Sequence, residues 1–248
     1  NFILCYLGAD SYAFVHRAFL EYFCAWELVW LFNDSQVLSL DQLKFEVFGK
    51  HWQDETWHEM MRLIAGMIDA NFTGSVIGFL LEQSGEENQF SNLFLAAKCL
   101  TEVRRWTDIA SITQKLLERI KALTTYDLDN HYTEFINHEK TALVREIRTR
   151  AVSAIAATWA EEKSTVSWLK TRAQSDEDND VRRAAVQELA RGWKDELGMV
   201  EFFVDRACHD SYVRGTGEFA EYEANPRQTA LEALVKHYPE QPQTLVVL

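Results

Sequence analysis

The sequence predicts an all-α protein in which helical hairpins stack side by side, and three observations predict this fold class. All three prolines lie beyond residue 225. Because proline breaks helix interiors but is common in turns, its absence from the rest of the chain indicates helices joined by short turns. The ten glycines leave little material for hairpins or phosphate-binding loops. Finally, an apolar pattern at helical spacing repeats in the C-terminal half.

The composition is that of a globular chain, with 47% hydrophobic and 25% charged residues. The net charge of −13 argues against a nucleic-acid surface, because phosphate binding depends mostly on lysine and arginine. No membrane association is expected, since the best apolar run, 22–32, is short and contains Glu27. The scattered cysteines form no CxxC pair, which predicts buried thiols in a reducing compartment and therefore a cytoplasmic protein: Cys5, Cys24, Cys99 and Cys208.

The repeat starts at 147–159 and recurs 34 residues later at 181–193. A third copy lies 45 residues after the second, so an insertion of 11 residues falls within about 211–225. The positions that coincide are Arg148/Arg182/Arg227, Val152/Val186/Leu231 and Trp159/Trp193/Tyr238, with Ala156/Ala190 shared by the first two copies. Each copy predicts a two-helix hairpin that buries its apolar face only by stacking on its neighbours.

Polar residues also occupy defined positions in the repeat. Asp176, Asp178 and Asp180 precede the first helix of the second copy, where carboxylates cap free N–H groups. The recurring arginines predict a structural ladder with neighbouring aspartates.

The run Asp180-Val181-Arg182-Arg183-Ala184-Ala185-Val186, followed by Leu189, resembles the HEAT repeat, in the short form also found in phycobilisome lyase-like proteins. The resemblance covers residues 144–248. It implies an α-solenoid with an extended surface that binds other proteins, and it implies no reaction by itself.

The N-terminal run from Tyr12 to Ala25 (YAFVHRAFLEYFCA) resembles the segment that ends the winged-helix part of NACHT-type STAND ATPases, which include the animal NOD-like receptors and many bacterial proteins. Ala18 departs from it, because the family carries Ser or Thr there. Residues 48–59 resemble the helical segment that follows. These resemblances imply three regions: the end of a winged helix (1–38), a helical domain (39–136) and HEAT-like repeats (137–248).

The family resemblance also implies a function. His16 would contact the β-phosphate of ADP, held with Mg²⁺ by a nucleotide-binding domain upstream in the intact protein. The repeats would bind a protein ligand or effector, and activation, with a defence role in the family, would involve oligomerisation. Since the chain starts at Asn1 and stops at Leu248 inside apolar stretches, we expect it to be part of a larger protein.

The residues themselves predict a plainer role for the N-terminal segment. They place His16 on a helix packed against aromatic side chains. Phe14, Phe19, Tyr22 and Phe23 are predicted to form a core-facing stripe.

We expect no catalysis by this chain alone and no cofactor or metal in it. A phosphate loop requires Gly-x4-Gly-Lys-Ser/Thr, whereas the only Gly-Lys pair, Gly49-Lys50, is followed by His51. His51, Glu55 and His58 share a helical spacing that zinc ligands also use, but the neighbouring tryptophans favour amphipathic packing.

The insertion is the candidate partner-binding loop, because insertions in repeat proteins often lie on the binding face. Its exposed side chains are predicted to be Tyr212, Arg214, Phe219 and Tyr222. A tolerated surface loop is the alternative.

Three functional interpretations therefore stand. The chain is the sensor region of a STAND ATPase, a free-standing HEAT scaffold, or an accessory protein of the phycobilin-lyase type.

Overall fold

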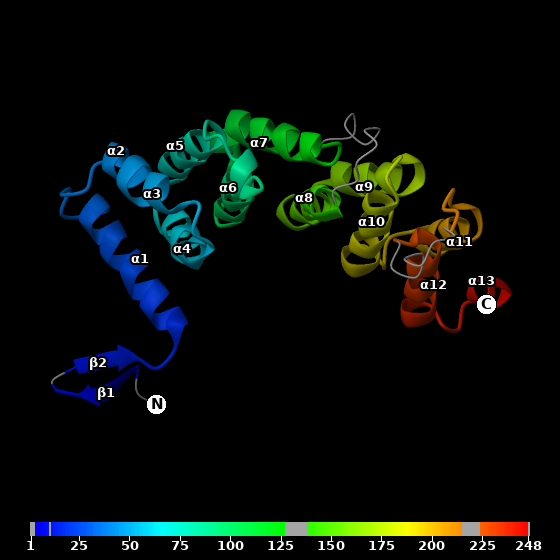
Figure 1. Cartoon of the computed structure of the whole chain (residues 1–248), viewed down its shortest axis with the longest axis horizontal. Coiled ribbons are helices and arrows are strands. Elements are labelled where there is room, and N and C mark those ends of the chain that lie inside the picture. Colours follow the sequence, from blue (N-terminus) through cyan, green and yellow to red (C-terminus); the bar gives the residue numbers. More distant parts are fainter. Residues whose placement is uncertain (1–2, 10, 127–137, 215–223, 248) are drawn as a thin grey trace. The chain divides into compact units, whose positions relative to one another are not determined.

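The computed structural model describes residues 3–9, 11–126, 138–214 and 224–247, and these are mostly helical, as predicted. The chain divides into two compact units, Asn1–Arg119 and Ile120–Leu248, with the division inside helix α7 (Ala110–Leu123). Figure 1 shows the order of the elements along the chain. The boundaries expected after residues 38 and 136 stay predictions.

Strands β1 (Leu4–Gly8) and β2 (Ser11–Phe14) form an antiparallel hairpin, a departure from the all-α prediction. Leu4 pairs with Phe14 and Tyr6 with Tyr12. Gly8, at φ +97°, supplies the left-handed backbone of the turn, which glycine adopts without steric cost. A low glycine count over the whole chain did not exclude this hairpin, because its turn uses one glycine and Ala9, which also has a positive φ of +48°.

Helix α1 (Arg17–Asn33) follows the hairpin, and short helices connect it to the longer ones of the first unit. The short ones are α2 (Leu40–Gln42), the π-helical η1 (Leu43–Phe48), α3 (Gly49–His51), and the 3₁₀ turns η2 (Glu55–Trp57), η3 (Glu86–Asn88) and η4 (Trp106–Ile109). The longer ones are α4 (His58–Met67), α5 (Ala70–Leu81) and α6 (Ser91–Thr101).

The core of the first unit lies where α4, α5 and α6 pack together, with α1 against α4. Its fully buried side chains include Phe48, Met61, Ile64, Leu80 and Leu95. Helix starts are fixed locally by side chains. Ser39 and Gln42 form a capping box at α2, and Asp69 accepts a hydrogen bond from the N–H of Asn71 at the start of α5.

The second unit contains three successive pairs of helices, one pair in each sequence repeat. They are α8 (His138–Thr158) and α9 (Lys163–Ser175), α10 (Asn179–Gly192) and α11 (Met199–His209), and α12 (Pro226–His237) and α13 (Pro242–Val247). The closest packing joins successive repeats: α9 lies against α10, and α11 lies against α12. Each predicted hairpin was expected to bury its apolar face only by stacking on its neighbours, and the pairs that pack most closely join neighbouring repeats. The apolar faces of the helices are covered mainly by the following repeat.

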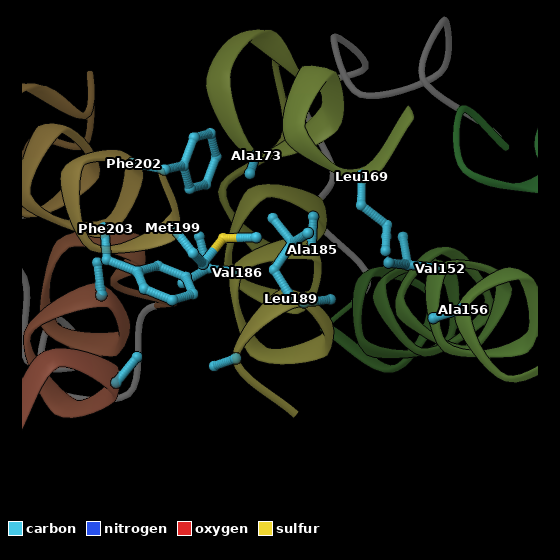
Figure 2. Close-up of a cluster of buried hydrophobic side chains, with 14 of the residues drawn as sticks. Val152, Ala156, Leu169, Ala173, Ala185, Val186, Leu189, Met199, Phe202 and Phe203 are labelled. Carbon is cyan, nitrogen blue, oxygen red and sulfur yellow. The ribbon is translucent and has the colours of Figure 1, made fainter. Parts of the chain in front are cut away.

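Figure 2 shows the apolar core that these helices share. Ala185 and Leu189 of α10 lie at its centre and are fully buried, with Val152 of α8 on one side and Phe203 of α11 on the other. The small alanines let neighbouring helices approach closely, which is why they recur at fixed positions in the repeat.

The repeat is also visible in the turn between its two helices. In the first copy, the Thr165 hydroxyl donates to the carbonyl of Trp159 at 2.7 Å. In the third copy, Thr244 donates to the carbonyl of Tyr238 at 2.8 Å. These are equivalent positions, so two copies close their turn with the same hydrogen bond.

Gly85 provides a sharp test of the first unit's packing. A Cβ atom there would lie 1.8 Å from Oδ1 of Asn92, whose Nδ2 donates to the carbonyls of Leu80 and Gln83. We expect Gly85→Ala to lower the free energy of unfolding by about 1–3 kcal/mol, the usual cost of overpacking, in urea denaturation followed by circular dichroism. Gly192→Ala is the control, since its Cβ meets open space and should leave stability unchanged or slightly raised. Equal effects of the two substitutions would contradict the packing described.

Candidate protein-interaction site

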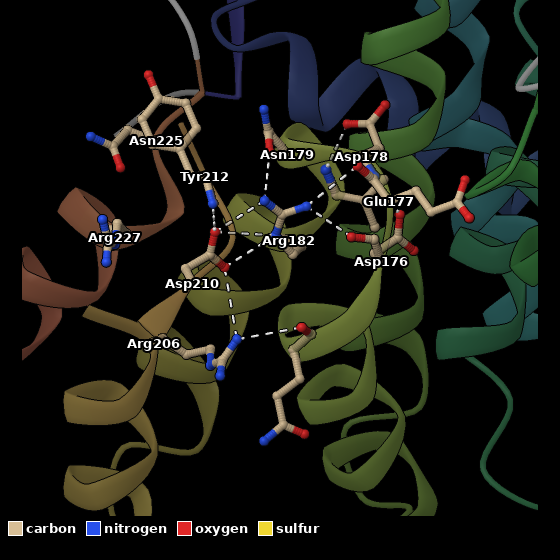
Figure 3. A network of polar contacts seen from close by, with 12 residues as sticks. Asp176, Glu177, Asp178, Asn179, Arg182, Arg206, Asp210, Tyr212, Asn225 and Arg227 are labelled. Carbon is tan, nitrogen blue, oxygen red and sulfur yellow. Dashed lines mark hydrogen bonds and ion pairs between the residues drawn. The ribbon is translucent and has the colours of Figure 1, made fainter. Parts of the chain in front are cut away.

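Arg182, the second of the recurring arginines, lies in a polar network between successive repeats, shown in Figure 3. The Arg182 side chain is 3% exposed and that of Asp210 is fully buried. Nε and Nη2 of Arg182 donate to the Asp210 carboxylate at 3.1 and 3.0 Å. Nη1 donates to the carbonyl of Asp176 at 2.8 Å and Nη2 to Oδ1 of Asn179 at 2.5 Å. Arg182 therefore ties the turn before α10 to the end of α11.

Arg148, one repeat earlier, is buried in the same way. Its Nη1 pairs with the carboxylate of Asp178, and its Nε and Nη2 donate to the carbonyl of Tyr126 at 2.8 and 2.7 Å. The predicted ladder between arginines and neighbouring aspartates is thus confirmed for Arg148 and Arg182. The Tyr126 carbonyl was not predicted, because a backbone acceptor leaves no signal in the sequence.

The third arginine behaves differently. Arg227 donates from Nη2 to the carbonyl of Cys208 and pairs with no carboxylate among the described residues. Its Nε is buried and has no hydrogen-bond partner in the described part of the chain. The ladder stays a prediction at Arg227, because the arginines of the earlier repeats bind aspartates 28–30 residues later, and the equivalent position lies beyond residue 248.

The predicted capping role of the aspartates before α10 is confirmed at Asp178, which accepts hydrogen bonds from the N–H groups of Asp180 and Val181. Burial raises the pKa of Asp176, because it disfavours the charged carboxylate, although Arg172 partly offsets the effect. Burial likewise raises the pKa of Asp180, which pairs with Arg145 at 2.7 Å.

The insertion was expected to expose Tyr212, Arg214, Phe219 and Tyr222. Tyr212 is only 7% exposed, so the prediction of an exposed tyrosine is wrong. Its N–H donates to Oδ1 of Asp210 at 2.8 Å, and this bond starts the insertion next to the buried Arg182 pair. Arg214 is exposed, whereas Phe219 and Tyr222 lie outside the described residues.

His16 is the N-cap residue of α1 and is exposed. Its side chain caps no N–H group, and its ring centroid lies 6.1 Å from that of Phe19. The expected aromatic neighbour is present, while the imidazole remains open to solvent.

Helix α1 carries an exposed row of large apolar side chains, in contrast to the predicted core-facing stripe. Tyr22 and Phe23 are exposed, and Trp26 is 50% exposed. Ala25 is the buried residue of this helix. Phe14 and Phe19 are half-buried, so the assignment of the stripe to the core is wrong at Tyr22 and Phe23. Helical spacing identifies a face but does not reveal whether another element covers it.

Two adjoining apolar grooves run along α1 where it meets the start of α4. They have volumes of about 490 and 470 Å³, and both are lined by Cys24, Trp57 and Met60. The sequence analysis missed these grooves. The i, i+4, i+8 spacing of Leu20, Cys24 and Leu28 was the available signal, but only the position of α4 turns that spacing into a groove wall.

The histidines near residue 55 have packing roles. The His51 ring stacks on Trp57 with centroids 3.7 Å apart, and Nε2 of the buried His58 donates to the carbonyl of Trp52 at 2.7 Å. Among the residues that the structure describes, no three His, Cys, Asp or Glu side chains converge as a metal site would require.

The cysteines differ from the prediction. Cys99 is buried, and burial raises the pKa of its thiol to about 12. Cys5, Cys24 and Cys208 are exposed.

Comparisons of the chain with protein-family models, with curated proteins and with solved structures find no match. Within the described ranges, no helix combines the length and the apolarity that crossing a bilayer demands.

The first prediction from the ladder concerns stability. Arg182→Ala leaves the buried Asp210 carboxylate without its main partner, so we expect the free energy of unfolding to fall by about 3–5 kcal/mol. Arg105→Ala is the control, because Arg105 pairs with Asp108 at 3.7 Å with both side chains exposed, 78% and 36%, and should contribute about 0–1 kcal/mol. Chemical denaturation measures both. Similar losses of unfolding free energy in the two variants would show that the buried pair stabilises the fold no more than an exposed pair does.

The second prediction concerns pH. The folded-state pKa of Asp176 lies above its unfolded value of about 4, so folding favours the protonated form. That contribution is full below about pH 4 and is lost as the pH rises through the folded pKa. Between pH 7 and pH 4, we therefore expect wild type to gain stability relative to Asp176→Asn as the pH falls.

Asp205→Asn is the control of opposite sign. A hydrogen bond from Arg206 is the main cause that lowers the pKa of Asp205. Wild type should therefore lose stability relative to this variant as the pH falls through the folded pKa, in the same denaturation series. If the stability difference from wild type changed with pH in the same direction for both variants, the opposite pKa shifts assigned to Asp176 and Asp205 would be contradicted.

Proposed function

We propose that the chain is the sensor and scaffold region of a NACHT-type STAND ATPase. In this proposal the second unit is a HEAT-like array that binds a protein ligand. The first unit contributes the end of a winged-helix region, which contacts a nucleotide-binding domain supplied upstream in the intact protein. Binding at the array shifts the population from a closed, ADP-bound state towards an open state that oligomerises.

The observation that carries the scaffold part is the repeated pairing between neighbouring copies. Arg148 with Asp178, and Arg182 with Asp210, connect successive repeats through equivalent arginines. Each helix pair buries its apolar face mainly against the next, which is how solenoid proteins build extended binding surfaces.

The exposed row on α1 supports the nucleotide-switch part. It lies in the segment that resembles the STAND proteins, and contiguous apolar surface of this kind usually marks an interface. An antiparallel hairpin that leads directly into a helix is compatible with the end of a winged-helix region.

The start of α1 also fits a phosphate. The first N–H groups of a helix have no intrahelical acceptor and carry a partial positive charge. The first turn of α1 contains no acidic residue, and His16 leaves its N–H groups uncapped. An imidazole N–H at this position can donate a hydrogen bond to an anionic oxygen, so His16 would help to hold the closed state.

The test is a His16→Leu substitution in the intact protein, followed by measurement of the ADP that stays bound after purification. We expect the variant to retain less ADP than wild type, because one hydrogen-bond donor to phosphate is lost. His209→Leu is the control, since His209 is also exposed but lies on α11. Equal ADP retention by all three proteins would count against the role of His16.

The sequence that precedes residue 1 in the encoded protein distinguishes this proposal from a free-standing scaffold. We expect a Gly-x4-Gly-Lys-Ser/Thr motif about 200–350 residues before residue 1, given ordinary domain sizes. If no such motif precedes the chain, the free-standing scaffold and the accessory protein of the phycobilin-lyase type remain.

A further inference from the structure

A cavity lies between the first and second repeats of the second unit, at the end where helices α8 and α10 finish. Its volume is about 570 Å³. Ala156 and Ala160 line the cavity on the side of the first repeat, and Trp193 and Glu196 line it on the side of the second. Its walls therefore come from two neighbouring repeats of the array, both of which the structure describes.

The equivalent place between the second and third repeats is bridged by a hydrogen bond. Tyr238 occupies in the third repeat the position of Trp193 in the second. Its hydroxyl donates to the carbonyl of Lys194, which is the equivalent of Ala160. Trp193 carries no hydroxyl, and the cavity is lined both by Trp193 and by Ala160. The cavity is therefore a property of this one interface and does not follow from the stacking of repeats as such.

The walls of the cavity carry more negative than positive charge. The charged residues that line it are Glu161, Glu162, Glu188, Glu196, Lys163 and Arg191. Glu188 pairs with Arg191 and accepts a hydrogen bond from the hydroxyl of Ser153. Glu161 and Glu196 are exposed, and their carboxylates form no hydrogen bond or ion pair with another described residue. One free carboxylate on each wall is thus available to a cation.

Trp193 adds an aromatic side chain to these carboxylates. The second unit already contains contacts between cations and aromatic rings: Nζ of Lys121 lies 5.8 Å from the centroid of the Trp168 ring, and Nζ of Lys170 lies 5.6 Å from that of Phe202. Within the described chain, no lysine or arginine occupies such a position over Trp193. The described carboxylates also do not converge in threes, as a metal ion would require, so the cavity suits an organic cation.

We propose that this cavity binds the guanidinium group of an arginine side chain in a partner protein. A guanidinium presents five N–H donors in one plane, so it can lie against Trp193 and donate to the carboxylates of Glu161 and Glu196. Cavities of about 300–1,000 Å³ enclose whole small molecules, so this cavity of about 570 Å³ has room for the side chain together with its backbone. The inference rests on the scaffold part of the proposed function, whose ligand it assigns to a chemical class.

The experiment titrates an acetylated and amidated Gly-Arg-Gly peptide into the whole chain, labelled with ¹⁵N and followed by NMR spectroscopy. The indole N–H signal of Trp193 is identified as the one that is missing from a Trp193→Phe variant. We expect this signal to shift saturably. Citrulline has nearly the shape of arginine but no charge, so a Gly-citrulline-Gly peptide should bind at least about tenfold more weakly, because it loses the charge-assisted hydrogen bonds and the cation–π contact.

The matching change in the protein is the double substitution Glu161→Gln and Glu196→Gln. It removes both free carboxylates and keeps the size of the side chains, so the dissociation constant of the arginine peptide should rise about tenfold. Because both side chains are exposed, the double variant should still fold, which circular dichroism checks. Glu240→Gln is the control. Glu240 is the exposed equivalent of Glu161 in the third repeat and does not line the cavity, so its substitution should change the affinity by less than about twofold.

Three outcomes would overturn the proposal. The first is the absence of a saturable shift of the Trp193 signal. The second is equal affinity of the arginine and citrulline peptides for wild type, or equal affinity of the arginine peptide for wild type and the double variant. The third is tighter binding of free L-arginine than of the arginine peptide, which would assign the cavity to a free amino acid instead of a partner protein. Since none of these measurements involves ADP or the sequence before residue 1, failure here is distinguishable from failure of the proposed function.

Discussion

The buried pair between Arg182 and Asp210 is the constraint on which the arrangement of the second unit depends. Removing both charges from water is expensive, and their attraction repays that cost only when the geometry is good and the remaining donors are satisfied. Here the guanidinium also reaches the Asp176 carbonyl and the Asn179 side chain. These acceptors come from the turn before α10, while Asp210 follows α11. A displacement of either element would leave a buried charge unpaired, so the pair fixes their relative positions.

The apolar core and the ladder have complementary roles. The core supplies non-directional stabilisation, which would tolerate some sliding of one helix along another. The buried ion pairs are directional, so they tolerate little sliding of one helix along another. Alanines such as Ala185 let α10 approach its neighbours closely. Arg182 of α10 therefore lies within hydrogen-bond distance of Asp210. We therefore attribute register to the polar contacts and most of the stability to apolar burial.

The sequence allowed the repeated features to be predicted, because repetition reveals a shared structural requirement. The pairing of Arg148 and Arg182 follows from residues that recur at fixed spacing, and the cap at Asp178 follows from the aspartates that precede α10. The features that were missed depend on contacts made once. The turn at Gly8 needs a single residue, and the burial of Tyr212 depends on its place beside Asp210. Likewise, the spacing of Tyr22 and Phe23 on α1 predicts a core position, whereas the structure shows both side chains exposed.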